Sequence, residues 1–142
     1  MAAKTPPPIA AYRLLLEYDG SRFQGWQKQG PKQSQDGVRT VAGSLENLLH
    51  KEGLRLVYLM GAGRTDAGVH ALGQVAHLHL EAGNAPRPGE LRRLLDAALP
   101  QDIALRDVRS CPPRFHARYD AVERSYLYQI SRRRSAFGKP WI

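Results

Sequence analysis

One arginine and one aspartate stand two residues apart in a glycine-rich stretch, residues 61–73, and are the side chains best suited to chemistry. On an extended loop Arg64 and Asp66 would lie on the same side, where a guanidinium can pair with a carboxylate and keep it ionised. An ionised, oriented aspartate can act as a nucleophile or as a base. Ion pairs also fix loops without any part in catalysis, and the pair by itself favours that structural interpretation.

The stretch that carries this pair is long for its place in the chain. It separates two predicted strands, which a hairpin of about two to five residues could connect. It holds thirteen residues, four of them glycine, and Asp66 is the only acidic residue between Glu52 and Glu81. The third glycine of a Rossmann loop and the lysine of a Walker loop are both missing, so neither nucleotide motif is present. Long loops of this kind are typical of functional sites.

Histidines and tyrosines after the loop suggest two further hypotheses. His70, His77 and His79 invite a metal site, but they have no cysteine nearby and no further ligand at zinc spacing. We therefore interpret the strand histidines as packing residues and predict no metal. Tyr126 and Tyr128 could stack bases on an open sheet face, although ordinary strand packing is the simpler interpretation of either one alone.

The elements that must position these residues follow from the hydrophobic pattern. Apolar runs predict strands over residues 12–18, 54–60, 74–80, 103–109 and 125–130. Apolar residues at helical spacing predict a helix that stops at Gly53 and a second from Pro88 to Pro100. The order predicts an α+β fold, a ferredoxin-like βαββαβ antiparallel sheet with both helices on one face, plus one extra strand. The other face of the sheet would be free to carry a ligand.

Composition narrows the class of partner. The chain has 142 residues, of which 42% are hydrophobic and 24% charged, a balance typical of one globular domain. Its net charge is +8, and 16 of its 21 basic residues are arginines, which favours a nucleic-acid partner. Solubility alone accounts equally well for a charge of this size.

The cellular location is predicted from what the sequence lacks. The longest aliphatic run covers only residues 14–16, too short to span a membrane. Cys111 is the only cysteine, which excludes an internal disulfide and favours a reducing compartment. Residues 1–10 contain three consecutive prolines and no apolar core of a signal peptide, so they predict a flexible arm. We therefore expect a cytoplasmic protein.

Four segments, taken in order, carry a more specific signal. They read YDGSRFQGWQ at residues 18–27, TV at 40–41, GAGRTDAGVHALGQVA at 61–76, and FHAR at 115–118 followed by RSYLY at 124–128. In these segments the chain resembles the bacterial TruA-type tRNA pseudouridine synthases. The resemblance overturns the structural interpretation of Asp66.

The resemblance implies an isomerase that converts uridine to pseudouridine in the anticodon stem-loop of tRNA, with no cofactor and no catalytic metal. Asp66 stands at the position of the catalytic aspartate, Arg64 at the arginine that pairs with it, and Tyr126 at the tyrosine that packs against the flipped uracil. Arg118 and His70 lie in the matched segments and are assigned to substrate binding as well. The target nucleotide must leave its stack before a buried carboxylate can act, either at C1′ or on the 2′ hydrogen.

The resemblance covers the N-terminal half of the family pattern, so residues 11–142 are expected to form the ferredoxin-like catalytic half. The family continues with a second half, absent from this chain, which lends an arginine and apolar residues to the cleft, and its members pair as homodimers on one tRNA. Ala42 replaces the usual glutamine, and the loop at residues 28–39 looks long. The alternative is a non-catalytic RNA-binding ferredoxin-like module, which would not need Arg64 and Asp66 in such a loop. A metal-dependent RNA hydrolase is a weaker option.

Overall fold

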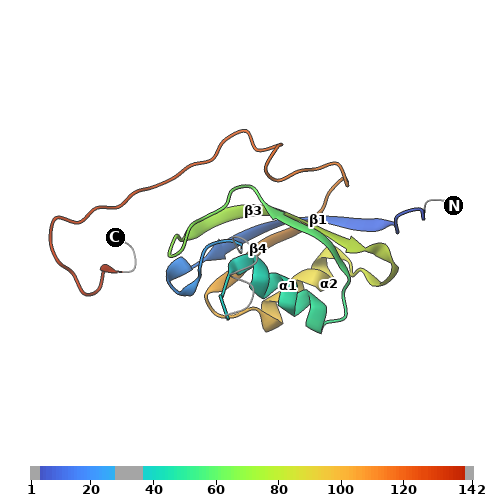
Figure 1. Ribbon diagram of the computed structural model, residues 1–142, viewed down its shortest axis with the longest axis horizontal. Coiled ribbons are helices and arrows are strands. Elements are labelled where there is room, and N and C mark those ends of the chain that lie inside the picture. The colour runs from blue at the N-terminus through green and yellow to red at the C-terminus, as the bar shows by residue number, and fades with distance from the viewer. Residues whose placement is uncertain (1–3, 28–36, 140–142) are drawn as a thin grey trace.

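The computed structural model describes residues 4–27 and 37–139, which form a four-stranded antiparallel sheet and two α-helices (Figure 1). In chain order the elements are β1 Ile9–Tyr18, α1 Val41–Lys51, β2 Leu56–Gly61, β3 Ala71–Glu81, α2 Pro88–Ala98 and β4 Ile103–Ser110. Two short 3-10 helices, η1 Gly20–Arg22 and η3 Ala82–Asn84, follow β1 and β3.

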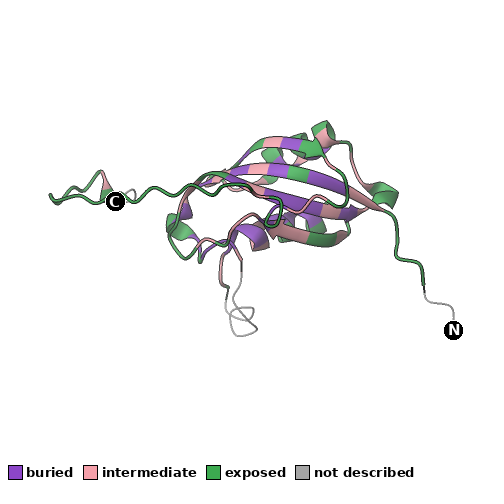
Figure 2. Cartoon of the chain, turned by 90° about the horizontal axis from the view of Figure 1, so that it is seen from above, coloured by how far each residue is buried: buried purple, intermediate pink, exposed green. Residues whose placement is uncertain are grey.

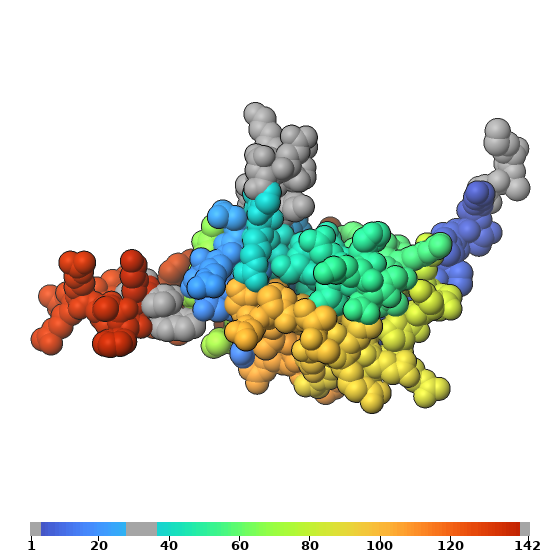
Figure 3. Space-filling model, turned by 90° about the horizontal axis from the view of Figure 1, so that it is seen from below, coloured from blue at the N-terminus to red at the C-terminus, as the bar shows by residue number. Residues whose placement is uncertain are grey.

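The strands lie in the order β2-β3-β1-β4, and each neighbouring pair is antiparallel. Both helices lie on one face of the sheet (Figure 1), and seen from below they cover that face side by side (Figure 3). Each helix therefore connects two strands of the same sheet and returns the chain across its lower face. This is the predicted ferredoxin-like α+β fold, and the prediction is confirmed.

The core lies between the sheet and the helices because alternate residues of the central strands are apolar. Seven side chains of β1 and β3 face the helices and are at most 3% exposed: Tyr12, Leu14, Leu16, Tyr18, Ala76, Leu78 and Leu80. Helical spacing places Leu45 and Leu49 of α1, and Leu91 and Leu95 of α2, against them. Each fully buried leucine contributes roughly 1.5–3 kcal/mol to folding.

Local signals set the ends of the helices. The Thr40 hydroxyl accepts a hydrogen bond of 3.0 Å from the Gly43 amide and so caps the first turn of α1. Gly53, with a φ of 74°, adopts the left-handed conformation that ends a helix. Helix α2 begins at Pro88, whose fixed φ suits the first helical position.

The upper face of the sheet, which we call the open face, carries no helix among the described residues (Figure 2). Over β1 and β4 it carries ion pairs. Arg106 lies 3.2 Å from Glu17 on β1, and Arg109 lies 2.7 Å from Asp107 within β4. These pairs are partly exposed, so each contributes little to stability. Arg13 lies 3.9 Å from the same Asp107 carboxylate, so two carboxylates offset most of the charge of three arginines on this half of the face.

Over β2 and β3 the open face is aromatic, and the chain after β4 crosses it (Figures 1 and 2). The Ala117 amide donates a hydrogen bond of 2.9 Å to Nδ1 of His77, whose side chain is 1% exposed. The rings of Tyr58, His79 and His116 lie 5.3, 5.3 and 4.7 Å from that of His77. A ring nitrogen that accepts a hydrogen bond carries no proton, so His77 is neutral and holds the crossing segment on the sheet.

The predicted strand at residues 125–130 is wrong. This stretch has no sheet partner in the described chain, and Tyr126, Tyr128 and Ile130 are 66%, 88% and 89% exposed. Alternating apolar residues form a strand only where a neighbouring strand accepts their backbone hydrogen bonds. The alternation in the sequence therefore marks a segment that can join a sheet, and the four described strands offer it no pairing.

Two other boundaries differ from expectation. Strand β1 begins at Ile9, so the last two residues of the predicted arm pair with Glu81 and Leu80 of β3. Most of the loop expected at residues 28–39 lies outside the described residues. Within the described ranges, neither α1 nor α2 is long and apolar enough to cross a membrane, and no other helix is.

We expect the free energy of unfolding to fall as the pH is lowered from 7 to 4, in part because His77 is neutral when folded. Burial lowers the pKa of His77 from 6.5 to about 4, helped by repulsion from His116 and His79 and only partly opposed by Asp120. The unfolded chain takes up this proton below pH 6.5 and the folded chain only near pH 4, so stability rises with pH across that window.

The measurement is urea unfolding across this pH range for the parent and His77→Gln, which keeps an acceptor and cannot titrate. A shift of this size corresponds to about 3 kcal/mol, and the variant should lose most of that pH dependence. His50→Gln, on the exposed surface of α1, is the matched control and should keep the parental profile. Parental pH dependence in His77→Gln would contradict the assignment.

Candidate active site

The glycine-rich loop is shorter than predicted because the strands on both sides extend into it. Strand β2 ends at Gly61, and the Ala62 amide still donates to the Val75 carbonyl at 2.7 Å. Strand β3 begins at Ala71, which pairs with Tyr18 of β1. The loop is therefore residues 62–70, which we call the Asp66 loop, and its outer glycines belong to the sheet.

Hydrogen bonds from β3 and from the segment after η1 fix the backbone on both sides of Arg64. The side-chain amide of Gln74 donates through Nε2 to the Gly63 carbonyl at 2.5 Å, and the Trp26 backbone amide donates to the Thr65 carbonyl at 3.0 Å. The Tyr18 hydroxyl lies 2.8 Å from the Thr65 hydroxyl, and burial raises the pKa of Tyr18. Arg64 therefore projects from a backbone that is held at the preceding and the following residue.

Close packing also holds the far end of the Asp66 loop. A Cβ atom on Gly20 would lie 1.9 Å from the Val69 carbonyl oxygen, so only glycine permits this approach. The Gly20 amide donates to Nδ1 of His70 at 2.9 Å, and Asp19 Oδ1 lies 3.2 Å from the same nitrogen. His70 thus connects the loop to the corner after β1. Its predicted role in substrate binding stays a prediction.

Arg64 and Asp66 do not pair as the sequence suggested. Arg64 Nε and Nη2 each lie 3.0 Å from the Gln27 amide oxygen, in the amide orientation that lets that oxygen face the guanidinium. The loop turns at Asp66, whose carbonyl accepts from the Val69 amide at 3.1 Å, with Gly68 at a φ of 80°. Spacing alone aligns two such side chains only on an extended backbone, and here Gln27 takes the guanidinium that Asp66 was expected to bind. The Asp66 side chain is exposed instead of buried.

Beside the Asp66 loop lies a pocket of about 350 Å³ that contains three of the five predicted site residues. Arg64, Arg118 and Tyr126 line it together, from positions far apart in the sequence, whereas Asp66 and His70 do not. The described lining includes three arginines and no carboxylate, so it favours an anionic ligand. The three residues meet because the segment anchored on His77 runs back toward the loop.

Three lining residues were missed by the sequence reasoning: Trp26, Gln27 and Arg124. All three lie in the segments at residues 18–27 and 124–128 that carry the family resemblance, so the signal was present and no role was drawn from it. Arg124 donates through Nε to the Ala62 carbonyl at 2.8 Å and through Nη2 to the Arg118 carbonyl at 2.6 Å.

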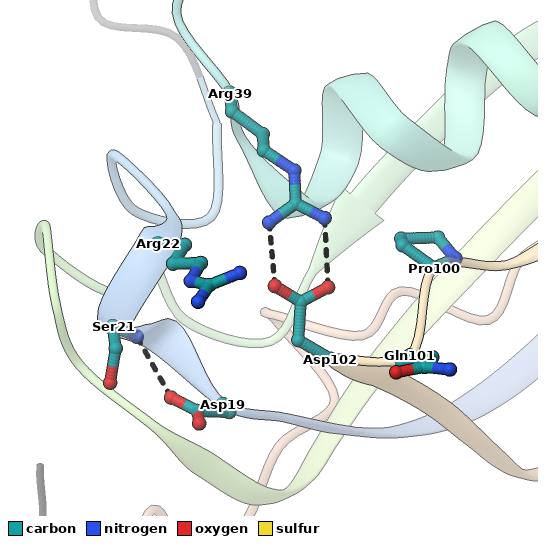
Figure 4. A pocket seen from close by; sticks show the side chains of 7 residues that line it. All are labelled: Asp19, Ser21, Arg22, Arg39, Pro100, Gln101 and Asp102. Atoms are coloured by element: carbon teal, nitrogen blue, oxygen red, sulfur yellow. Dashed lines mark hydrogen bonds and ion pairs between the residues drawn. The ribbon is translucent and has the colours of Figure 1, made fainter.

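A larger pocket, of about 650 Å³, opens between the corner after β1 and the start of β4 (Figure 4). Its charges satisfy one another, since Arg39 donates two hydrogen bonds to Asp102, at 2.6 and 2.8 Å. This pairing lowers the pKa of Asp102, and the Arg39 guanidinium also lies 4.0 Å from the Phe23 ring centre. We interpret this pair as a structural tie between the segment before α1 and the sheet.

No three His, Cys, Asp or Glu side chains within residues 4–27 and 37–139 are grouped so as to hold a metal ion. Two of the open-face histidines use Nδ1 as an acceptor for backbone amides: His77 accepts from Ala117, and His116 accepts from Tyr119 at 3.1 Å.

Comparison with known proteins assigns the family. Residues 14–120 match the model of the tRNA pseudouridine synthase family, a span that includes Arg64, Asp66 and Arg118. The chain belongs to this family.

Individual relatives agree with that assignment. The chain is 42% identical over 119 residues to tRNA pseudouridine synthase A of a Bacillus species, covering 84% of this chain and 46% of the relative. It is 45% identical over 125 residues to the protein of that name from Afipia carboxidovorans, covering 87% of this chain and 48% of that relative. The protein of that name from Escherichia coli is 41% identical over 130 residues, covering 92% of this chain and 45% of that relative. The chain spans about half the length of these relatives.

We predict that Gly20→Ala lowers stability and displaces the Asp66 loop, because its methyl group would overlap the Val69 carbonyl. Overpacking of this kind costs roughly 1–3 kcal/mol, measurable by urea unfolding. Gly63→Ala is the matched control, since its methyl group would lie 3.5 Å from the Tyr126 hydroxyl, an ordinary contact. Equal stability of the two variants would contradict the close packing at Gly20.

Proposed function

We propose that this protein isomerises uridine to pseudouridine in the anticodon stem-loop of tRNA. The observation that carries the proposal is the pocket where Arg64, Arg118 and Tyr126 meet beside the Asp66 loop, in a chain that belongs to the pseudouridine synthase family. The similar proteins from Bacillus, Afipia and Escherichia bear the name of this activity. In this proposal Asp66 is the catalytic carboxylate and Arg64 helps to displace the target base.

The chemistry of the pocket suits a nucleotide taken out of its stack. A volume of about 350 Å³ is of the order that encloses a small ligand. Arginines bind phosphate through paired donors, and the Tyr126 ring, which is 66% exposed, has a face available for a base. Flipping brings the C1′ bond within reach of a side chain, where it is not reachable inside a helix.

The Asp66 carboxylate needs a more enclosed environment than these residues provide. Its carboxylate is exposed, and a hydrated carboxylate is less well oriented for attack at C1′ or for removal of the 2′ hydrogen. A second wall over the open face would enclose it. We infer that this wall is the second half of the family pattern, packed against the exposed apolar side chains of residues 121–139 that do not line the pocket: Val122, Leu127, Tyr128, Ile130 and Phe137.

The partners and location follow from the same proposal. The substrate is tRNA, held by the net positive charge of the chain, and no cofactor is needed because the uracil is only detached, rotated and joined again through carbon. We further propose a homodimer, so that two subunits hold one tRNA, and a cytoplasmic location. Chromatography of the protein with and without tRNA tests the oligomeric state.

Asp66→Asn should abolish isomerisation while leaving the fold and tRNA binding largely intact. The amide keeps the shape of the carboxylate and removes the nucleophile, so the rate should fall by about a thousandfold or more. The readout, in whichever form of the protein is active, alone or joined to a second half, is pseudouridine in digested tRNA, separated from uridine by liquid chromatography. Asp96→Asn, on the exposed surface of α2, is the control and should keep full activity. A tenth of the parental rate in Asp66→Asn would refute the assignment of Asp66.

The 142-residue chain alone should bind tRNA weakly and form little pseudouridine, because the open face lacks its second wall. The same chain joined to a second half of the family pattern should be active on the same tRNA. Full turnover by the chain alone would refute the need for that wall, and inactivity of both forms would refute the proposed function. Tight, catalytically silent tRNA binding by both forms would indicate an RNA-binding module.

A further inference from the structure

Arg124 joins the two backbone segments that carry the site. Its Nε donates to the Ala62 carbonyl at the start of the Asp66 loop, at 2.8 Å. Its Nη2 donates to the carbonyl of Arg118, at 2.6 Å, on the segment that follows β4. Hydrogen bonds from a charged donor are stronger than neutral ones, so one guanidinium fixes the separation of these two segments.

Each of these segments is also tied to the sheet, close to the residue that Arg124 contacts. The Asp66 loop is held from below through Gly63 and Thr65. The segment after β4 is held by the bond from the Ala117 amide to buried His77, one residue before Arg118. Arg124 is the contact through which two independently anchored pieces of backbone meet at the pocket.

The shape of the guanidinium suits this task. Its donors lie in one plane and point in different directions, so a single side chain can reach two carbonyls on different segments. A Cβ on Gly63 would lie 3.7 Å from Arg124 Cδ and 3.5 Å from the Tyr126 hydroxyl, which places both side chains against the loop. A lysine ammonium carries the same charge on a single nitrogen, and we do not expect it to reach both carbonyls.

We propose that Arg124 is a positioning residue of the site, which sets the gap between Arg64 on the Asp66 loop and Arg118 on the opposite segment. It acts through backbone carbonyls, not through contact with the reacting atoms. The catalytic consequence of this inference rests on the proposed function. A gap that is wrong by about 1 Å can slow a reaction by about a hundredfold. The two hydrogen bonds of Arg124, which we call the Arg124 clamp, are a property of the folded chain and can be studied without substrate.

The first experiment measures the clamp in the 142-residue chain. Nitroxide labels are attached to the two cysteines of an Ala67→Cys, Arg114→Cys variant in a Cys111→Ser background, both positions being exposed, and the label distance is measured by pulsed electron resonance. The chain with Arg124 intact should give one narrow distribution, and both Arg124→Lys and Arg124→Gln should broaden it. Arg132→Gln, an exposed arginine further along the same segment, should leave it unchanged. Unchanged distributions in both Arg124 variants would overturn the proposal.

The second experiment measures the consequence, in whichever form of the protein is active, alone or joined to a second half. Arg124→Lys keeps the charge and should lower kcat about ten- to a hundredfold with KM changed less than about threefold. Arg132→Gln should leave kcat unchanged. A raised KM with normal kcat would overturn the positioning role and make Arg124 a contact for tRNA. Absence of pseudouridine with the parent would overturn the proposed function and leave the clamp to be decided by the distances.

Discussion

The hydrogen bond from the Ala117 amide to the His77 imidazole is the contact on which the arrangement of the open face depends. The helices already cover the other face, so the chain leaving β4 can pack only on the open face or extend into solvent. A buried, neutral imidazole supplies one acceptor at a fixed point of β3. From there the chain is brought back to the Asp66 loop, and Arg118 and Tyr126 reach the same pocket as Arg64.

The partners of the arginines explain how a strongly basic chain concentrates its positive potential. Over β1 and β4, and in the pocket shown in Figure 4, arginines face carboxylates. Each of the carboxylates of Glu17, Asp102 and Asp107 pairs with at least one arginine. At the pocket beside the Asp66 loop three arginines line the described surface with no carboxylate. A field of this kind attracts phosphate to the one place where the loop and the crossing segment meet.

Local physics made most of the fold predictable from the sequence. The alternation of Ala76, Leu78 and Leu80 and the helix stop at Gly53 act within a few residues, and both appear in the structure as the pattern indicates. The predicted strand at residues 125–130 was wrong because strand pairing depends on a partner strand, which no local pattern can supply. The predicted Arg64–Asp66 pair was wrong for a similar reason, because the partner that Arg64 takes, Gln27, lies far away in the sequence. Arg124 was visible only as part of a motif, because its partners are backbone carbonyls of distant residues.

The state of His77 tests the central claim of this account most directly. Nitrogen-15 NMR of the histidine side chains, followed from pH 7.5 to pH 3.5, reports which ring nitrogen carries the proton and where each ring titrates. The account predicts a neutral His77 at pH 7 with its proton on Nε2, a scalar coupling across the bond between the Ala117 amide and Nδ1, and a pKa of about 4. A proton on Nδ1, or a His77 that titrates near the ordinary pKa of about 6.5, would contradict it.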